Sequence, residues 1–303
     1  VKSPNKRRLS LLMDTFTDPR ISDDYFYTIL YVGNPSQRVE IALDTGSGLP
    51  YFACKETCNH CGKHDDPYYI TNNSSTFNWL KCGDSLCKGS CTRNKQCKWT
   101  QKYIDHSAIE AIVFNDKVRF YQYPYLPDNK YAKSQSNDYM NSFDIDMVFG
   151  CSVKEANTIF RQGADGVMGL SMTSRSFVDQ YFGKIDESIH EQQFGHCFGR
   201  KNGGLLIFGK TEIENVLKQF DILNDIKWLP LLRNKNTHGW YKLESKGFII
   251  KSSINDDNMV NVEYKPNLNS GYSGAVIDTG SSTLSMPKKQ ADGILDGILN
   301  ILN

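Results

Sequence analysis

The sequence contains the tetrapeptide Asp-Thr-Gly-Ser twice, at residues 44–47 and 278–281. Each copy directly follows a short apolar run, at residues 41–43 and 275–277, so each is predicted to lie at the end of a buried strand. One Asp-Thr-Gly alone is an ordinary turn sequence. Two copies in the same context, separated by most of the chain, indicate an internal duplication with one copy in each of two β-rich lobes.

The residues before the first copy have the pattern of a β-hairpin. Residues 25–32 and 39–43 are apolar runs rich in β-branched and aromatic residues, and a turn at 33–36 separates them. Aromatic residues make up 12% of the chain, which also fits pleated sheets. We therefore expect a mostly β fold.

A helix is expected after the second copy. Pro287 fits the first turn of a helix, whereas Gly293 and Gly297 weaken it by about 1 kcal/mol each, so that tertiary packing must hold it. The apolar residues expected on one face are Ile294, Leu295, Ile298, Leu299 and Leu302.

The two aspartates of the repeat, Asp44 and Asp278, are the candidate catalytic residues. Two carboxylates held about 3 Å apart cannot both ionise, so they share one proton and titrate in two steps. The ionised carboxylate can take a proton from a water molecule, while the protonated one donates to the carbonyl of a scissile peptide bond. Because this chemistry requires no metal, cofactor or covalent nucleophile, we expect none.

The residues that follow each aspartate have predicted supporting roles. A threonine hydroxyl can brace the opposite loop, a glycine permits a tight turn, and a serine hydroxyl can donate a hydrogen bond that favours the charged carboxylate. The supporting residues are Thr45, Gly46, Ser47, Thr279, Gly280 and Ser281.

Nine cysteines are spread unevenly along the chain. Seven lie close together, namely Cys54, Cys58, Cys61, Cys82, Cys87, Cys91 and Cys97, whereas Cys151 and Cys197 stand apart. Such clustering predicts disulfides and an oxidising compartment, with one cysteine left unpaired within this chain. The alternative is a zinc site, because Cys58, His60, Cys61 and His64 have ligand-like spacing.

Other features bear on compartment and partners. Asn72 and Asn73 each begin an N-glycosylation acceptor triplet, which agrees with secretion. No segment upstream of Tyr25 has the apolar length of a signal peptide, so we expect that a targeting segment has been removed or omitted. No apolar run reaches the roughly 18 residues that span a bilayer, and an anchor beyond Asn303 is left open. The formal net charge of +1 gives no electrostatic case for nucleic acid or a membrane surface. Polypeptide substrates are expected from the proposed carboxylate chemistry, and the chain is expected to be a monomer.

These motifs resemble the pepsin family of aspartic proteases, which carry one such turn in each of two lobes. Residues 165–170 resemble the hydrophobic-hydrophobic-Gly segment that crosses behind the first catalytic loop, and residues 103–107 resemble the flap over the substrate. The resemblance implies a bilobal double-ψ β-barrel architecture with a truncated second lobe. It also implies that Tyr103 binds substrate and that Tyr51 is its aromatic partner.

The resemblance divides the chain into regions. We expect an N-terminal extension, an N-terminal catalytic lobe with a Cys-rich insert, and a partial C-terminal catalytic lobe. Their bounds are 1–22, 23–215 with the insert at 54–98, and 216–303. The insert is similar to that of the nepenthesins and of the plasmepsin V type, and the abundance of Asn, Lys, Asp and Ile favours the latter.

Two features depart from the family pattern. His106 stands where the flap normally has glycine, and it is expected to be a surface residue rather than a pH-responsive substrate contact. The chain also ends at Asn303, before the second crossing segment, which puts the support of Asp278 and the activity of this chain in doubt.

The resulting hypothesis is an aspartic endopeptidase of the secretory pathway, located in the endoplasmic reticulum, a vacuole or outside the cell. The alternative is a pepsin-fold binding protein or inhibitor without catalysis, which the two intact Asp-Thr-Gly turns disfavour. A Cys-rich adhesion module with incidental turns is a further alternative.

Overall fold

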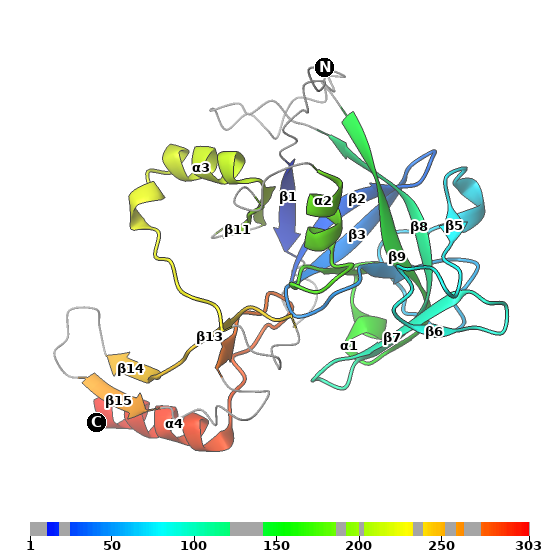
Figure 1. The fold of residues 1–303 in the computed structure, drawn as a ribbon. Coiled ribbons are helices and arrows are strands. Elements are labelled where there is room, and N and C mark those ends of the chain that lie inside the picture. Colours follow the sequence, from blue (N-terminus) through cyan, green and yellow to red (C-terminus); the bar gives the residue numbers. More distant parts are fainter. Residues whose placement is uncertain are drawn as a thin grey trace.

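The computed structural model describes residues 11–17, 25–121, 142–185, 192–199, 203–232, 239–251, 259–263 and 274–302. Within these residues the fold is mostly β, as the sequence predicts. The expected bilobal arrangement is reflected in a large β-barrel lobe and a smaller unit formed by the later part of the chain (Figure 1).

The barrel of the first lobe closes on itself. Around it, β2, β3, β10, β4, β9 and β8 follow one another, and β8 pairs again with β2. The bounds of these strands are β2 Phe26–Val32, β3 Gln37–Asp44, β4 Tyr51–Ala53, β8 Ala108–Tyr121, β9 Ser142–Ala156 and β10 Gly166–Gly169. The hairpin expected before Asp44 is therefore confirmed as β2 and β3.

Side-chain alternation explains how these strands enclose a core. Along β2, Thr28, Leu30 and Val32 are buried while the residues between them are half-exposed, so one face of the strand packs inward. In contrast, β3 is buried from Val39 to Asp44, because neighbouring structure covers both of its faces.

Strand β10 occupies the central position behind the first aspartate. Although β3 and β4 are consecutive in the sequence, β10 lies between them, parallel to β3 and antiparallel to β4. A Cβ on Gly166 would lie 1.8 Å from the Tyr51 carbonyl oxygen, and one on Gly169 would lie 1.9 Å from that of Gly48. The crossing segment expected at residues 165–170 is therefore confirmed, and its glycines allow backbones to approach closely.

The sheet continues beyond the barrel through β1, β12 and β11. Strand β1, Leu11–Thr17, pairs with both β2 and β12, Gly204–Phe208, and β12 pairs with β11, Phe194–Phe198. Leu11 and Met13 are buried in the core. Part of the N-terminal extension expected at 1–22 is thus a strand of the sheet, because its alternating apolar residues cover the core.

Short elements complete the first lobe and the connection to the second. They are η1 Thr71–Asn73, β5 Asn78–Trp79, β6 Ser90–Cys91, β7 Cys97–Lys102, α1 Thr158–Arg161, α2 Phe177–Lys184, α3 Lys210–Gln219 and η2 Leu223–Asp225. Ser176 caps the N-terminus of helix α2, because its hydroxyl accepts a hydrogen bond from the Asp179 backbone N–H at 3.1 Å.

Four disulfides hold the Cys-rich insert, and they join Cys54 to Cys151, Cys58 to Cys61, Cys82 to Cys91 and Cys87 to Cys97. The one free cysteine is Cys197, which agrees with the odd total. The zinc alternative is wrong for this structure, because Cys58 and Cys61 are bonded to each other and the ring nitrogens of His64 face Glu155 and Gln162.

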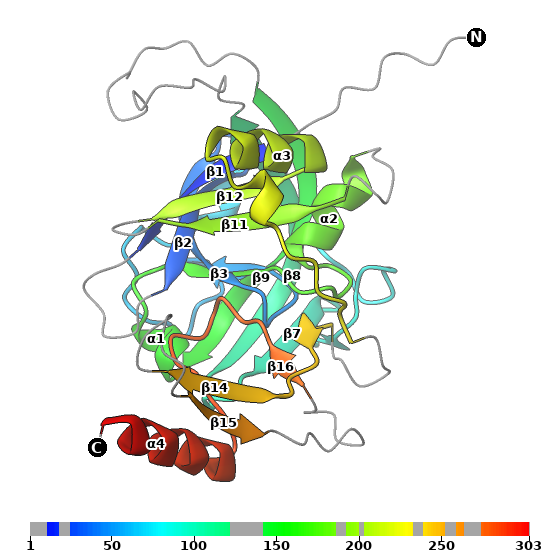
Figure 2. The same ribbon diagram turned by 90° about the vertical axis from the view of Figure 1, so that its left-hand side faces the viewer.

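The later part of the chain forms two small strand pairs and a helix. Their bounds are β13 Lys242–Leu243 with β16 Ala275–Val276, β14 Gly247–Lys251 with β15 Met259–Glu263, and α4 Lys288–Leu302. Helix α4 lies along β14 and β15, at the opposite end of the molecule from α3 (Figure 1 and Figure 2).

The predicted helix is confirmed, but its packing face is different from the expected one. A Cβ on Gly293 would lie 3.1 Å from Val262 Cγ1, and one on Gly297 would lie 2.6 Å from Ile250 Cδ1. The two glycines that weaken the isolated helix thus let it approach the strand pair. Leu295 and Leu299 are exposed at 58% and 56%, and the side chain of Leu302 is outside the described residues.

No helix in the described part of the chain is long and apolar enough to cross a membrane.

Candidate active site

The first aspartate, Asp44, ends strand β3 inside the first lobe. Asp44 is only 7% exposed, and its backbone carbonyl accepts a hydrogen bond from the Leu170 N–H at 2.8 Å. One carboxylate oxygen accepts the Gly46 N–H at 2.7 Å. The strand and the crossing segment behind it therefore fix Asp44 from both sides.

The second aspartate, Asp278, follows strand β16 and repeats the same local turn. Its carboxylate accepts the Gly280 N–H at 2.9 Å, as Asp44 accepts that of Gly46. Asp278 is exposed, in contrast to buried Asp44. Within the described residues no strand crosses behind Asp278, so its support is weaker.

Reciprocal hydrogen bonds join the two aspartate loops. The Thr45 N–H donates to Thr279 Oγ1 at 3.1 Å, and the Thr279 N–H donates to Thr45 Oγ1 at 3.0 Å. Each hydroxyl also donates across the interface, to the carbonyl of Ile277 at 2.9 Å and to that of Leu43 at 3.0 Å. The predicted bracing by threonine is present, and it brings Asp44 and Asp278 together.

The glycines of the two loops make room for the opposite carboxylate. A Cβ on Gly46 would lie 2.9 Å from both carboxylate oxygens of Asp278, and a Cβ on Gly280 would lie 2.5 Å from Asp44 Oδ1. Neither glycine has a positive φ. Glycine is therefore required at both positions because the opposite carboxylate lies so close, as well as because each loop makes a tight turn.

The electrostatics of the pair favour a protonated Asp44. Burial and the neighbouring charge of Asp278 raise the pKa of Asp44 to about 7, and a hydrogen bond between the two carboxyls adds to the effect. The Ser47 hydroxyl and the Gly46 N–H act in the opposite direction. Asp44 thus retains its proton in mildly acidic solution.

The two serines behave differently from each other. Ser47 is 3% exposed and close enough to lower the pKa of Asp44, although its hydroxyl has no partner of standard hydrogen-bond geometry in the described part of the chain. The expectation for Ser281 is wrong, because its hydroxyl donates its proton to the Thr283 carbonyl at 2.9 Å and has none left for Asp278.

The flap residues lie close to the first aspartate. Strands β7 and β8 form a hairpin, and Tyr103, in its turn, donates a hydrogen bond from its hydroxyl to that of fully buried Tyr51 at 3.3 Å. Burial, together with the charge of Asp44, raises the pKa of Tyr103. The structure thus brings Tyr51, Tyr103 and Asp44 into one site.

His106 occupies the flap turn with a φ of 66° and is exposed, as expected of a surface residue. Its carbonyl accepts a hydrogen bond from Asn157 Nδ2 at 2.7 Å, which holds the turn in the left-handed conformation.

Sequence reasoning missed Trp240, whose indole N–H donates to the Gly46 carbonyl at 2.8 Å. The only available signal was a tryptophan in a β-like stretch of the second lobe, which does not reveal a contact with the first lobe.

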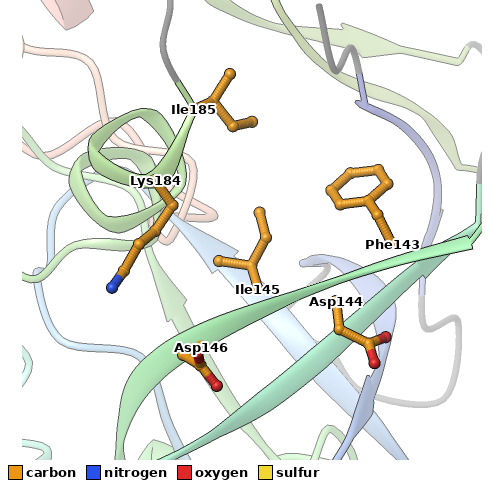
Figure 3. A pocket seen from close by; sticks show the side chains of 6 residues that line it. All are labelled: Phe143, Asp144, Ile145, Asp146, Lys184 and Ile185. Atoms are coloured by element: carbon orange, nitrogen blue, oxygen red, sulfur yellow. The ribbon is translucent and has the colours of Figure 1, made fainter. Parts of the chain in front are cut away.

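A separate hollow of about 260 Å³ lies between β9 and the end of α2 (Figure 3). Phe143, Ile145 and Ile185 face it, while the carboxylates of Asp144 and Asp146 lie on the other side of the strand. None of these is a predicted site residue.

The family pattern described as Xylanase inhibitor N-terminal matches residues 26–210, which is more than half of the chain. The chain belongs to this family, and its sequence relatives include aspartic proteases. Aspartic protease 5 of Toxoplasma gondii is 31% identical over 207 residues, which cover 62% of this chain and 20% of that protein. Plasmepsin V of Plasmodium falciparum is 32% identical over 191 residues, which cover 61% of this chain and 29% of that protein.

Two further proteins match a larger part of the chain. The protein ASPARTIC PROTEASE IN GUARD CELL 2 of Arabidopsis thaliana is 24% identical over 285 residues, which cover 91% of this chain and 52% of that protein. Conglutin gamma from lupine seeds superposes with a TM-score of 0.69 at 15% identity, over 97% of this chain and 70% of its own. At that identity the superposition shows a shared pepsin-like fold.

Proposed function

We propose that this chain carries the catalytic centre of an aspartic endopeptidase, which hydrolyses internal peptide bonds of proteins. The observation that carries the proposal is the reciprocal Thr45 and Thr279 bracing, which places the buried Asp44 against Asp278. The raised pKa of Asp44, to about 7, supports it, because the reaction needs one protonated and one ionised carboxyl.

The two aspartates have different roles in the proposed reaction. Asp278, the exposed and less supported carboxylate, is the general base that takes a proton from a water molecule between the pair. Protonated Asp44 donates to the carbonyl oxygen of the scissile bond as the water oxygen attacks its carbon. When the tetrahedral intermediate collapses, the C–N bond breaks and Asp278 gives the proton it took from the water to the leaving nitrogen. Asp44 takes back a proton from a hydroxyl of the intermediate, whose oxygen becomes the carbonyl of the new carboxylic acid.

The substrate is a polypeptide in an extended conformation that lies beneath the flap. Tyr103 contacts the substrate, and Tyr51 holds the Tyr103 hydroxyl in place. The exposed Ile104 at the flap tip, 80% accessible, fits a hinged cover over a peptide chain.

The proposed location is the secretory pathway, because four disulfides form and persist in oxidising compartments. Within the family we favour the plasmepsin V-like subgroup, on the basis of the Cys-rich insert and of the similarity to plasmepsin V itself. We further propose a monomer that does not bind nucleic acid, in agreement with the net charge of +1.

The second candidate is a pepsin-fold inhibitor without catalysis. It is favoured by the description of the matching family pattern, Xylanase inhibitor N-terminal. Unlike a protein that has lost catalysis, this chain retains both aspartates in mutual contact.

Peptide cleavage tests the two candidates. The chain is incubated with a mixed peptide library from about pH 3 to pH 8, the range in which such a pair is half-protonated, and products are identified by mass spectrometry. We expect internal cleavage that disappears in Asp44→Asn and in Asp278→Asn, with Asp146→Asn as the exposed control. If the wild-type chain cuts no peptide, or if cleavage persists in both variants, the enzyme proposal is wrong.

A further inference from the structure

We propose that Trp240, a residue of the second lobe, is a positioning residue for the catalytic turn of the first lobe. Its indole N–H donates a 2.8 Å hydrogen bond to the Gly46 carbonyl, two residues from Asp44. This inference rests on the proposed function, because it concerns the carboxyl that donates the proton.

The residues on either side of Trp240 bind the same part of the first lobe. The Gly239 carbonyl accepts the Met172 N–H at 2.8 Å, and the Tyr241 hydroxyl donates to the Leu170 carbonyl at 2.8 Å. Leu170 in turn donates its N–H to the Asp44 carbonyl at 2.8 Å. We call residues 239–241 the interlobe strap. The strap is hydrogen-bonded both to the turn after Asp44 and to the residues that follow the crossing strand β10.

The strap also reaches the second aspartate loop. The Tyr241 carbonyl accepts the Ile277 N–H at 2.9 Å, directly before Asp278. Three consecutive residues thus connect both loops of the pair. This connection is additional to the threonine bracing, and the two meet at Ile277, whose N–H donates to Tyr241 and whose carbonyl accepts from Thr45.

Local geometry holds the indole in its orientation. Gly239 has a φ of +77°, and a Cβ there would lie 2.3 Å from Thr173 Cγ2, so only glycine fits. The buried Lys242 also places its amine over the indole, 5.1 Å from the centroid of the Trp240 ring. The backbone at Gly239 and the amine over the ring therefore both favour the direction in which the indole N–H points.

The consequence for catalysis follows from the two hydrogen bonds of Gly46. Its carbonyl is held by Trp240, and its N–H donates to Asp44 at 2.7 Å. Holding the carbonyl keeps the turn in the conformation that aims the N–H at the carboxylate. That N–H lowers the pKa of Asp44, so loss of the indole bond would allow the pKa to rise further.

The test replaces Trp240 by phenylalanine, which keeps an aromatic ring and removes the N–H donor. We expect kcat to fall about 5- to 10-fold with KM changed less than about twofold, since one hydrogen bond that acts on the reacting group is lost. We also expect the alkaline limb of the pH profile, where Asp44 loses its proton, to move to higher pH. The matched control is Trp228→Phe, because Trp228 is 79% exposed.

The outcomes separate a positioning role from simple lobe packing. If Trp240→Phe lowers thermal stability but has the kcat and pH profile of Trp228→Phe, the inference is wrong. If Trp240→Phe does not fold, as judged by its amide NMR spectrum, Gly239→Ala displaces the strap while keeping the indole and is measured in the same way.

Failure of the proposed function would be distinguishable from failure of this inference. If the wild-type chain cleaves no peptide, the enzyme proposal falls, and the carboxyl carbon of 13C-labelled Asp44 is titrated by NMR instead. An upward shift of the Asp44 pKa in Trp240→Phe, absent in Trp228→Phe, supports the positioning role. An unchanged titration overturns it.

Discussion

Thr45 and Thr279 exchange hydrogen bonds, because each backbone N–H donates to the hydroxyl of the other residue, at 3.1 Å and 3.0 Å. The two residues come from different lobes, so these bonds determine how the lobes meet. The pair of aspartates depends on this meeting, since each threonine directly follows one of them.

Replacing either threonine by valine is expected to weaken the pairing of the lobes. Valine has the same shape but lacks the hydroxyl, which both donates and accepts here, so each change removes two hydrogen bonds worth about 1 kcal/mol each. We expect peptide cleavage to fall at least tenfold in Thr45→Val and in Thr279→Val. Thr100→Val, on the exposed face of β7, is the control. Equal activity of all three variants would contradict the bracing role.

The pair of aspartates could be predicted because its sequence signal is local and repeated. The sequence shows an apolar run followed by Asp-Thr-Gly-Ser at both sites, and hydrophobic periodicity predicts the strands that precede the two aspartates. The crossing segment was also predicted, from its resemblance to the hydrophobic-hydrophobic-Gly segment of the pepsin family, and the structure shows that its two glycines allow the close backbone contacts of β10.

The features that the sequence does not predict depend mostly on contacts between segments that are distant in the chain. The partner of Ser281 was wrong because a hydroxyl donates only once, and the geometry of the turn directs it to Thr283. Gly293 and Gly297 were regarded as weak points of a helix, whereas the approach of β14 and β15 makes them its contact face. The indole bond of Trp240 likewise joins residues that lie far apart in the sequence.

Asp44→Asn is expected to change the pH dependence of stability. The pKa of Asp44 is raised from 3.8 to about 7 in the folded chain, so the folded state binds this proton more tightly than the unfolded state does. Stability is therefore lost as the pH rises from about 4 to about 7. The variant removes this loss, which amounts to on the order of 2–4 kcal/mol at pH 8. Urea unfolding at pH 4 and pH 8 measures it.

The control for that experiment is Asp146→Asn, an exposed carboxylate that pairs with Lys117 at 3.6 Å. Its effect is expected to stay below about 1 kcal/mol at both pH values. If Asp44→Asn gains no stability relative to wild type between pH 4 and pH 8, the folded chain does not hold Asp44 in its protonated form.

The turn at Asn72 and Asn73 is expected to carry an N-linked glycan. Both residues are exposed in η1, and both begin acceptor triplets. When the chain is produced in a eukaryotic secretory host, peptide N-glycosidase should lower its mass by that of one glycan or more. The shift should vanish in the Asn72→Gln, Asn73→Gln double variant and persist in Asn78→Gln, which lies outside any such triplet. A chain with its disulfides formed but no shift would contradict this expectation.

The buried pair of His64 and Glu155 is expected to hold the Cys-rich insert against β9. Both side chains are 0% exposed, and His64 Nε2 lies 3.0 Å from Glu155 Oε2. Burial alone would lower the pKa of His64, but the hydrogen bond and charge of Glu155 outweigh it and raise the pKa. The stabilisation is therefore complete below pH 6.5, the ordinary value, and is lost as the pH rises through the raised pKa of the folded chain.

Glu155→Gln removes the charge and keeps the shape of the side chain, so it isolates this contribution. We expect a loss of about 3–5 kcal/mol in the free energy of unfolding at pH 5, the range for breaking a buried ion pair, and a smaller loss at pH 9. Glu110→Gln is the matched control, because Glu110 pairs with Lys98 at 2.7 Å with its side chain 38% exposed, and exposed pairs contribute under about 1 kcal/mol. Equal losses in the two variants, or a loss at pH 9 as large as that at pH 5, would show that the buried histidine is not held in its charged form by Glu155.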